Sequence, residues 1–364
     1  MVPRASLPSP LIAALAAMPD PAADSQVSHY EDELAQHFGV VHAVAVASGT
    51  AALHCALAAC GIGPGDEVLV PAVSVVMSAA PVLYAGARPV FIDCDRSGVG
   101  FNYGDLAAKV TPRTKAIIPV HLWGRAGDPE RLASFAATRR LRVIEDACQA
   151  HGTRVGGRLA GTFGDLGCFS TKDGKILWSG EGGFILANDA DLAGRCRAFR
   201  THWQTPPPGE TPLTRLGCNY RLAEPLAAIA RTNLARFDQL LARRQYQTQL
   251  LTNSLGGTPG IVVMAAEPGW NGYAPLARIN LARPRAFCER LAALGVANSV
   301  GTYHLTSCDQ RPMFSDFADT PCRIAASFIE SLLAVVMTEH DDDKRIRRYA
   351  DIITREAVAW TSRC

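Results

Sequence analysis

Two side chains able to do covalent and acid–base chemistry follow strand-like runs in the middle of this sequence. The segment Phe169–Gly183 carries a lysine in a short non-helical stretch before a Gly-Glu-Gly-Gly turn. Upstream, the apolar run Arg142–Asp146 ends in a carboxylate. A lysine amine can form a Schiff base, and a carboxylate can pair with a pyridinium nitrogen. Together these two groups are what pyridoxal 5′-phosphate (PLP) needs.

Two lysines, Lys172 and Lys175, compete for the covalent role. Each can equally be a solvated surface charge, as most lysines are. A catalytic lysine needs a lowered pKa, which burial beside a cationic ring would supply. Lys175 lies nearer the glycine turn and is better placed to be held rigidly, so the spacing favours it and leaves Lys172 open.

A phosphate site is indicated by Ser48-Gly49-Thr50, which opens a helix directly after a strand. Free N–H groups and the positive end of the helix dipole attract a phosphate there. An ordinary helix cap has the same sequence pattern, so the motif indicates a phosphate site only in combination with the lysine segment. Ser170 could add a hydroxyl group.

Two further polar residues follow Asp146. Gln149 could reach the hydroxyl group of a PLP ring. His151 has two interpretations, a role on the substrate side or a packed histidine with satisfied nitrogens.

Composition narrows the function classes. The chain has 364 residues, a net charge of +2 and 48% apolar residues, so it is long enough for two domains and offers no electrostatic case for binding nucleic acid. Its eleven cysteines are scattered, odd in number and without a C-x-x-C pair. This pattern argues against a disulfide framework and against a zinc or other metal site, and favours small buried hydrophobic residues in a reducing cytosol.

The N-terminal apolar run Leu11–Met18 is flanked by prolines and is too short to span a membrane. The sequence therefore predicts a cytoplasmic enzyme with no membrane contact and a poorly ordered leader over residues 1–25.

Helices and strands alternate from about residue 30 to residue 235. Strands are expected at Ala43–Ala47, Glu67–Val70, Pro89–Asp93, Ala116–Val120, Arg142–Asp146, Gly167–Ser170 and Phe184–Ala187. Continuous apolar runs separated by helical stretches predict an α/β fold with a mostly parallel sheet covered on both faces. Ligands gather at the carboxyl ends of such strands, where Asp93, His121 and Asp146 fall.

The second half of the chain predicts a smaller α/β unit. A long helix over Pro225–Thr252 is expected to join a large domain (residues 26–240) to a small one (residues 241–364). The small domain should contain the strand Ala274–Leu281, the helices Pro284–Leu294 and Lys344–Val358, and a polar loop over Thr302–Pro321.

From about residue 30 to residue 360 the chain resembles the DegT/DnrJ/StrS family of PLP-dependent aminotransferases. The resemblance is carried, in order along the chain, by Ser48-Gly49-Thr50, the turn Gly61–Val68, Pro119–Gly124, Glu145–Gly152, the Gly-Glu-Gly-Gly turn and Gly217–Leu222.

The resemblance implies the aspartate-aminotransferase fold (fold type I) and a role for each matching residue. The covalent lysine is Lys175, which resolves the competition with Lys172. Asp146 pairs with the ring nitrogen and Gln149 with the ring hydroxyl. The residues implied at the phosphate are Gly49, Thr50 and Ser170. An obligate homodimer with a shared active site is implied, in which Asn219 and Arg221 reach the cofactor of the neighbouring subunit.

Two positions depart from the family pattern. Val75 aligns with an aromatic residue that stacks on the cofactor ring, and loss of that stacking is worth about 1 kcal/mol. Gly174 before the lysine is similar to the branch that includes 3-amino-5-hydroxybenzoate synthase, which puts the substrate in doubt more than the cofactor.

The resemblance implies transfer of an amino group from glutamate or glutamine to a keto-sugar or keto-cyclitol, in amino sugar or aminocyclitol (antibiotic) biosynthesis. One alternative is a dehydrating PLP enzyme that aromatises an aminated cyclohexanoid, and another is a non-catalytic PLP-binding regulator. Substrate contacts are expected from loops that contain Val75, Trp123, His151, Trp178, His202, Tyr303 and His304, although each could equally be packing.

Overall fold

The computed structural model describes residues 25–361, so all but the last residue of the predicted leader lies outside it. The central sheet of this part has seven strands. They are β1 (His42–Val46), β2 (Glu67–Pro71), β3 (Arg88–Ile92), β4 (Thr114–Ile117), β5 (Arg142–Asp146), β8 (Leu166–Ser170) and β9 (Gly183–Ala187). A hairpin and a small sheet hold β6 (Arg154–Val155), β7 (Arg158–Leu159), β10 (Ile261–Val263), β11 (Leu276–Ile279) and β12 (Leu332–Ala334).

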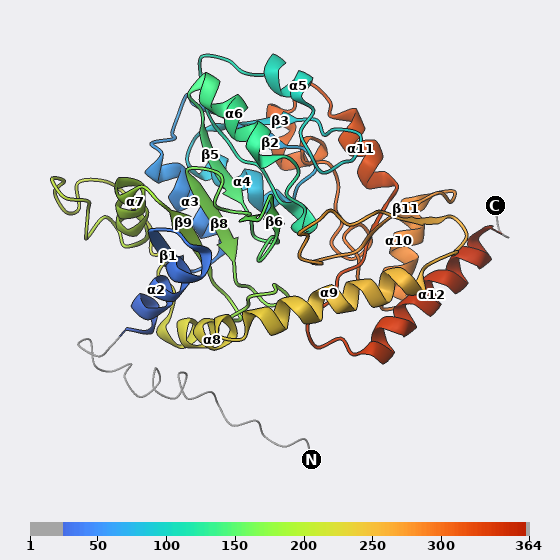
Figure 1. Cartoon of the computed structure of the whole chain (residues 1–364). Coiled ribbons are helices and arrows are strands. Elements are labelled where there is room, and N and C mark those ends of the chain that lie inside the picture. The colour runs from blue at the N-terminus through green and yellow to red at the C-terminus, as the bar shows by residue number, and fades with distance from the viewer. Residues whose placement is uncertain (1–24, 362–364) are drawn as a thin grey trace.

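The strand order of the central sheet is β1-β9-β8-β5-β4-β2-β3 (Figure 1). The pairs β2–β3, β2–β4, β4–β5 and β5–β8 are parallel, whereas β9 runs antiparallel to both of its neighbours. This confirms the predicted mostly parallel sheet. β8 and β9 are buried along their whole length, because helices cover both faces.

Helices cover the central sheet on both sides (Figure 1). On one face α3 packs against α4 and α7, and on the other the side chains of α2, α5 and α6 meet the strands. These six helices are α2 (Gln26–Phe38), α3 (Gly49–Ala59), α4 (Val76–Tyr84), α5 (Tyr103–Ala108), α6 (Pro129–Arg139) and α7 (Ala190–Arg200).

The long helix predicted over Pro225–Thr252 is wrong as a single element. The structure has α8 (Glu224–Leu234) and α9 (Phe237–Ser254), separated at Ala235 and Arg236. The buried Asn233 donates to the carbonyl of Trp178 (2.7 Å) and accepts from Arg236 Nε (2.9 Å) at this break. No glycine interrupts the apolar spacing at the break, so no local pattern in the sequence predicts it. The predicted domain boundary at residue 240 lies inside α9.

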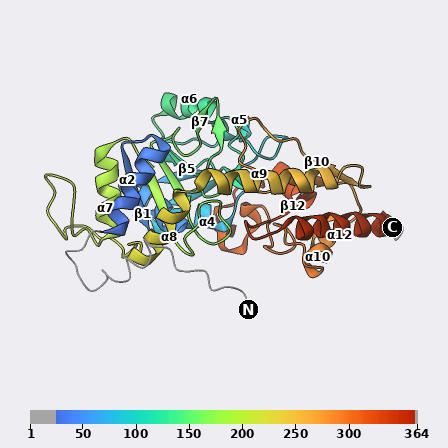
Figure 2. The same cartoon turned by 60° about the horizontal axis from the view of Figure 1, so that its bottom comes forward.

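The small antiparallel sheet has the order β10-β11-β12 and lies beyond α9. Figures 1 and 2 both show α9 running beside the last helix, α12. The helices of this part are α10 (Pro284–Ala293), α11 (Arg323–Glu330) and α12 (Asp343–Thr361). Three short 3₁₀ turns complete the described elements, η1 (Leu122–Gly124), η2 (Cys308–Gln310) and η3 (Pro312–Phe317).

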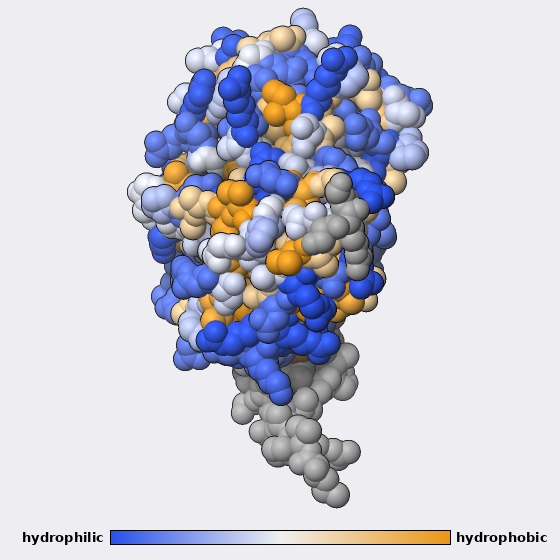
Figure 3. Space-filling model, turned by 90° about the vertical axis from the view of Figure 1, so that its right-hand side faces the viewer, coloured by the Kyte–Doolittle hydropathy of each residue, from blue (hydrophilic) through white to orange (hydrophobic). Residues whose placement is uncertain are grey.

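Three further features, the hydropathy of the helices, the cysteines and the surface, agree with the predicted α/β fold. Across residues 25–361 no helix is both long enough and apolar enough to cross a membrane. The ten cysteines in that range are free, and seven are buried, which confirms the predicted packing role for those seven. Figure 3, which looks at the right-hand side of Figure 1, shows apolar residues as scattered patches among polar ones on that face.

Candidate active site

The three polar residues predicted at the strand ends have different roles in the structure. Asp93 accepts hydrogen bonds from two backbone N–H groups at the start of α11, so it caps that helix. His121 forms a buried pair with Glu145, with 2.8 Å between His121 Nε2 and Glu145 Oε2. Asp146 alone of the three lies close enough to Lys175 to influence its charge.

The pairing of β5 with β8 decides which groups share the site. Asp146 is the register partner of Cys168, so their side chains lie on the same face of the sheet, and Ser170 follows two residues later on that face. Helix α3 covers this face and contacts both strands. The carboxylate, the Ser170 hydroxyl and the N-terminus of α3 therefore meet at the carboxyl end of the sheet.

Hydrogen bonds fix the orientation of the Asp146 carboxylate, which is 4% exposed. Ser78 Oγ donates to Asp146 Oδ2 at 2.6 Å, and the backbone N–H of Cys148 donates to Oδ1 at 3.2 Å. Ser74 Oγ in turn donates to Ser78 Oγ at 2.8 Å. A carboxylate with a donor on each oxygen cannot rotate freely, so it presents one fixed edge to a ring nitrogen.

The lysine segment is a tight loop between β8 and β9. The backbone N–H of Thr171 donates to the carbonyl of Gly182 at 2.8 Å, and the N–H of Ser179 donates to the carbonyl of Thr171 at 2.7 Å. Ile176 and Leu177 are buried, which anchors the loop immediately after Lys175. Hydrogen bonds and apolar anchors together give the rigidity that the sequence argument required of Lys175.

The two competing lysines have different surroundings. Lys172 is exposed, whereas Lys175 is half-buried beside Tyr273, Cys148 and Asp146. Burial lowers the pKa of the Lys175 amine, but these three neighbours raise it, and the net pKa lies above the ordinary value. The lowered pKa expected from the sequence depends on a cationic ring, and the protein groups alone act in the opposite direction.

The phosphate end of the site is built around Gly49. Ser48 caps α3 by accepting from the N–H of Ala51 at 3.0 Å, whereas the N–H groups of Gly49 and Thr50, which precede Ala51, have no acceptor inside the helix. A Cβ on Gly49 would lie 2.7 Å from Cys148 Sγ and 2.8 Å from the Ser170 Cβ. The glycine therefore lets the N-terminus of α3 pack directly against Cys148 and Ser170.

Gln149 is oriented by an unusual backbone conformation. Its Oε1 accepts the N–H of Trp123 at 2.7 Å, and Trp123 has a φ of 57°, in the left-handed region that non-glycine residues rarely adopt. Because the carbonyl oxygen of the amide is engaged, the NH₂ group is the end left to donate to a ring hydroxyl. The amine, the carboxylate, this amide and the helix N-terminus form a donor set that fits PLP.

His151 is packed inside the protein. It is 0% exposed and packs against Phe169 and Phe184, with ring centroids 5.2 and 6.0 Å away. Phe169 lies on the sheet face opposite Asp146, because it alternates with Cys168 and Ser170. The ring is packed, as one of the two interpretations expects, but its nitrogens are not satisfied, because neither has a hydrogen-bond partner in the described structure. Burial, followed by the charges of Lys175, His37 and Arg244, lowers the pKa of His151 to about 3.

The other predicted substrate residues take structural or exposed positions. Trp178 Nε1 donates to Glu339 at 2.9 Å, which ties the lysine loop to the C-terminal part of the chain. Trp123 is buried, and its indole donates to Ser299 at 3.1 Å. His304 is exposed with a φ of 51°, and its carbonyl accepts from Arg311.

The residues implied for a neighbouring subunit lie on the surface. Asn219 and Arg221 are both exposed. They end a loop that follows α7 and projects from the body of the molecule (Figure 1). Val75 is half-buried immediately before α4.

Sequence reasoning missed three residues around the site, Ser78, Tyr273 and Arg244. Ser78 stands within a helix whose other residues are mostly apolar, and only its position opposite β5 reveals its bond to Asp146. Tyr273 and Arg244 come from the C-terminal half of the chain, so no local spacing connects them with Lys175. Gly217–Leu222 is the segment furthest along the chain that the sequence motifs connect with the cofactor.

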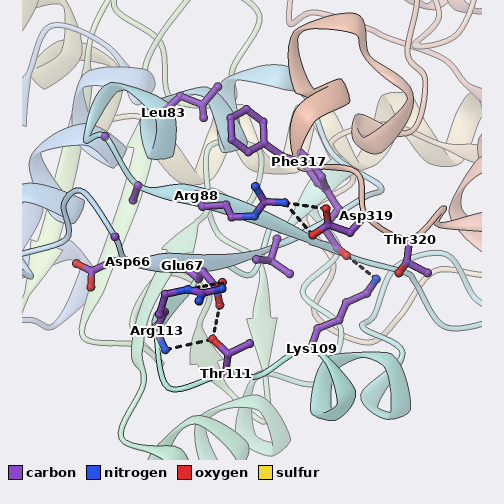
Figure 4. Close-up of a pocket in the computed structure, with 15 residues that line it drawn as sticks. Asp66, Glu67, Leu83, Arg88, Lys109, Thr111, Arg113, Phe317, Asp319 and Thr320 are labelled. Carbon is purple, nitrogen blue, oxygen red and sulfur yellow. Dashed lines mark hydrogen bonds and ion pairs between the residues drawn. The ribbon is translucent and has the colours of Figure 1, made fainter.

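A separate cleft of about 700 Å³ lies at the opposite end of the sheet, at the amino ends of β2 and β3 (Figure 4). Three cations line it, and each has a carboxylate partner, in the pairs Arg88–Asp319, Lys109–Asp105 and Arg113–Glu67. Its charges are therefore satisfied within the protein, and it lies away from Lys175.

We expect Ser78→Ala to weaken PLP binding. The substitution removes the donor to Asp146 Oδ2, and a hydrogen bond to a charged group contributes about 1.5–3 kcal/mol, so the PLP dissociation constant should rise by roughly tenfold or more. A titration that follows the cofactor absorbance measures this constant. Ser134→Ala, which removes an exposed serine on α6, is the control, and equal affinity in both variants would contradict the role given to Ser78.

We expect His151→Leu to reduce the acid sensitivity of folding. Because the folded pKa is about 3 and the ordinary value is 6.5, the unfolded chain binds a proton first, so wild-type stability is retained above pH 6.5 and lost as the pH falls toward 3. Between pH 7 and pH 5 this group costs the wild type about 2 kcal/mol of unfolding free energy. Urea unfolding at both pH values measures the difference. The exposed His304→Leu should leave the pH dependence unchanged, and the same result for His151→Leu would contradict the assignment.

Comparison with known proteins agrees with this geometry. Residues 22–354 match the DegT/DnrJ/EryC1/StrS aminotransferase family. The chain is 37% identical over 328 residues (89% of this chain, 87% of the relative) to a UDP-N-acetyl-3-dehydro-α-D-glucosamine 3-aminotransferase of Acidithiobacillus ferrooxidans. It is also 37% identical over 255 residues (68% of this chain, 60% of the relative) to an L-glutamine:2-deoxy-scyllo-inosose aminotransferase of Streptoalloteichus tenebrarius.

Among solved structures, that of a 3-amino-5-hydroxybenzoic acid synthase has a TM-score of 0.83 and 29% identity, with 96% of each chain covered. This confirms the predicted PLP-aminotransferase fold. The match across nearly the whole chain, together with the fold, establishes that this protein belongs to the DegT/DnrJ/EryC1/StrS family and is a PLP-dependent aminotransferase.

Proposed function

We propose that this enzyme moves an amino group from glutamate or glutamine to the ketone of a sugar nucleotide or a cyclitol, in amino sugar or aminocyclitol biosynthesis. The observation that carries the proposal is the meeting of Lys175, Asp146 and the N-terminus of α3 at one end of the sheet. The names of the two curated relatives, one acting on a UDP-linked sugar and one on an inosose, support the acceptor class.

In this proposal four groups hold the cofactor. Asp146 pairs with the ring nitrogen in the orientation that Ser78 fixes. Gln149 donates its NH₂ group to the ring hydroxyl, and Val75 packs on the ring face. The phosphate binds at Gly49 and Thr50 at the start of α3, with Ser170 as a further donor. When bound, PLP supplies an electron-withdrawing ring that stabilises negative charge on the substrate carbon.

Lys175 has two tasks. Its amine holds the cofactor covalently between turnovers. When the amine is free, it takes the proton from the substrate carbon and returns it one position away, acting as base and then as acid. In the protein alone the pKa of this amine lies above the ordinary value, and a bound cationic ring would oppose that rise, so that the free amine can accept a proton.

A second subunit completes the site in this proposal. Asn219 and Arg221 are exposed in a single chain, where the projecting loop returns to the body of the molecule beside Thr201, so they are available to another chain. The same loop exposes Leu213 and Leu216, the latter to 93%. Apolar side chains so exposed on a protruding loop are typical of a surface that a partner covers.

An aromatising reaction is the second candidate, because the structure of 3-amino-5-hydroxybenzoic acid synthase resembles this chain. The Gly174 that suggested that branch has a φ of 87°, which favours glycine for the backbone alone. The glycine therefore gives no independent support for a particular substrate.

We expect Lys175→Ala to abolish covalent attachment of PLP and to lower turnover by about 10²–10⁴-fold or more, because both tasks of the amine are lost. The measurement is borohydride reduction of the loaded protein followed by peptide mass spectrometry. Lys172→Ala, an exposed lysine in the same loop, is the matched control and should behave like the wild type. A reduced adduct at residue 172 would overturn the assignment.

The reaction is tested with a panel of amino donors and keto acceptors. Glutamate or glutamine should convert the loaded enzyme to its amine form, seen by absorbance, and a 3-keto UDP-sugar or a keto-cyclitol should restore the original spectrum. An aliphatic amine as product supports the main proposal, an aromatic product supports the alternative, and no conversion with any donor contradicts both.

We expect Leu216→Asp to weaken the homodimer. A buried apolar anchor at an interface contributes about 2 kcal/mol or more, so the dimer dissociation constant should rise roughly 30-fold or more. Sedimentation velocity over a dilution series measures it. Val262→Asp, an exposed apolar residue on β10, is the control, and equal dissociation constants for both variants would argue against this loop as the interface.

A further inference from the structure

Arg311 is a half-buried cation that has no carboxylate partner among residues 25–361. Its Nη2 donates to the carbonyl of His304, which is a neutral acceptor. Its Nε is buried and has no acceptor, and Nη1 has none either within the described residues. The carboxylate nearest in sequence, that of Asp309, is occupied by the N–H of Cys322 at 2.9 Å and by a serine hydroxyl. A guanidinium has five N–H donors and stays charged, so most of the binding capacity of Arg311 is unused.

Other arginines that contact the same loop are neutralised by the protein. Arg285 donates to a carbonyl of the loop and pairs with Glu330 at 3.0 Å. Arg88 also donates to a loop carbonyl and pairs with Asp319 at 2.8 Å. Arg311 differs from both, because its charge faces only a carbonyl. A half-buried charge loses part of its hydration, so it binds an incoming anion more strongly than a fully exposed charge does.

Hydrogen bonds attach the segment that carries Arg311 to the Asp146 network. The backbone N–H of Arg311 donates to the carbonyl of Cys308 at 3.1 Å. Cys308 Sγ in turn lies 3.3 Å from the carbonyl of Ser74. The hydroxyl of Ser74 is bonded to Ser78, which donates to Asp146. One side of the loop is therefore fixed to the group proposed to pair with the ring nitrogen.

The other side of the loop is attached to the Gln149 network. The backbone N–H of Leu305, next to the residue that accepts from Arg311, donates to the carbonyl of Ser299 at 2.9 Å. Ser299 Oγ accepts the indole N–H of Trp123 at 3.1 Å, and the backbone N–H of Trp123 donates to Gln149 at 2.7 Å. Because both attachments lead to proposed ring ligands, Arg311 lies at the rim of the proposed cofactor site.

We propose that Arg311 is a specificity-determining residue that binds an anionic group of one substrate, either a carboxylate of the amino donor or a phosphate of a nucleotide-linked acceptor. The proposal rests on the proposed function and adds the residue that recognises the charge of its substrate. A guanidinium binds both kinds of oxyanion through paired N–H groups. Tyr303 and Met313 on the same loop are 61% and 58% exposed, and they offer apolar surface to the rest of that substrate.

The test measures binding without turnover, on full-length protein loaded with PLP. Two probes separate the two sources of the anion. Glutarate carries two carboxylates like those of glutamate but no amine, and UDP carries the phosphates of a nucleotide-linked sugar. Isothermal titration calorimetry gives the dissociation constant of each probe for wild type, Arg311→Gln and Arg311→Lys. Arg347→Gln, which removes an exposed arginine on α12, is the matched control.

Arg311→Gln should raise the dissociation constant of one probe by about tenfold to a hundredfold, because a hydrogen bond between charged groups is lost. Arg311→Lys should have a smaller effect, since it keeps the charge but not the paired N–H groups. An effect on UDP alone assigns Arg311 to the acceptor and favours a sugar nucleotide over a cyclitol, which carries no phosphate. An effect on glutarate alone assigns Arg311 to the donor. Arg347→Gln should match the wild type for both probes.

Equal dissociation constants in wild type and Arg311→Gln for both probes overturn the proposal, and so does a wild type that binds neither. A variant that binds both probes normally but forms a weaker dimer in sedimentation velocity also overturns it, because Arg311 then pairs with the other subunit. In turnover, KM for the assigned substrate should rise while kcat changes little. If no donor converts the loaded enzyme, the proposed function fails, while calorimetry still decides whether Arg311 binds an anion.

Discussion

The parallel pairing of β5 with β8 is the constraint on which the active site depends. The register that sets Asp146 opposite Cys168 brings a carboxylate and the start of the lysine loop to the same end of the sheet. The antiparallel β9 then returns the chain, and the loop over residues 171–182 between the two strands is held by backbone hydrogen bonds. A slip of one residue between β5 and β8 would turn Asp146 toward the opposite face.

Around this pairing, buried polar groups hold the side chains of the candidate site in one orientation. Ser74, Ser78 and the backbone of Cys148 hold the Asp146 carboxylate, and Trp123 holds the Gln149 amide. Such networks gain little net stability, since each bond replaces one to water. Their value lies in presenting donors and acceptors at fixed positions before a cofactor arrives, so binding does not have to order them.

The sequence predicted those parts of the site that short motifs record. Lys175, Asp146, Gln149 and the start of α3 each lie in a local pattern, and the central strands could be read from continuous apolar runs. The contacts from Ser78, Tyr273 and Arg244 could not be predicted, because they join segments far apart in the chain through side chains that look ordinary where they stand. The break between α8 and α9 could not be predicted for a related reason. Asn233 bonds Arg236 at the break and the carbonyl of Trp178 in the lysine loop, which is distant in the sequence.

The dependence of the lysine loop on late residues has a consequence for biosynthesis of the protein. Tyr273 and Glu339, which contact Lys175 and Trp178, leave the ribosome long after the central sheet has been made. A nascent chain that has reached α8 thus carries every recognisable motif for the vitamin B6 derivative without the groups that brace its lysine. The lysine loop therefore gains its full set of contacts only when nearly the entire polypeptide has been made.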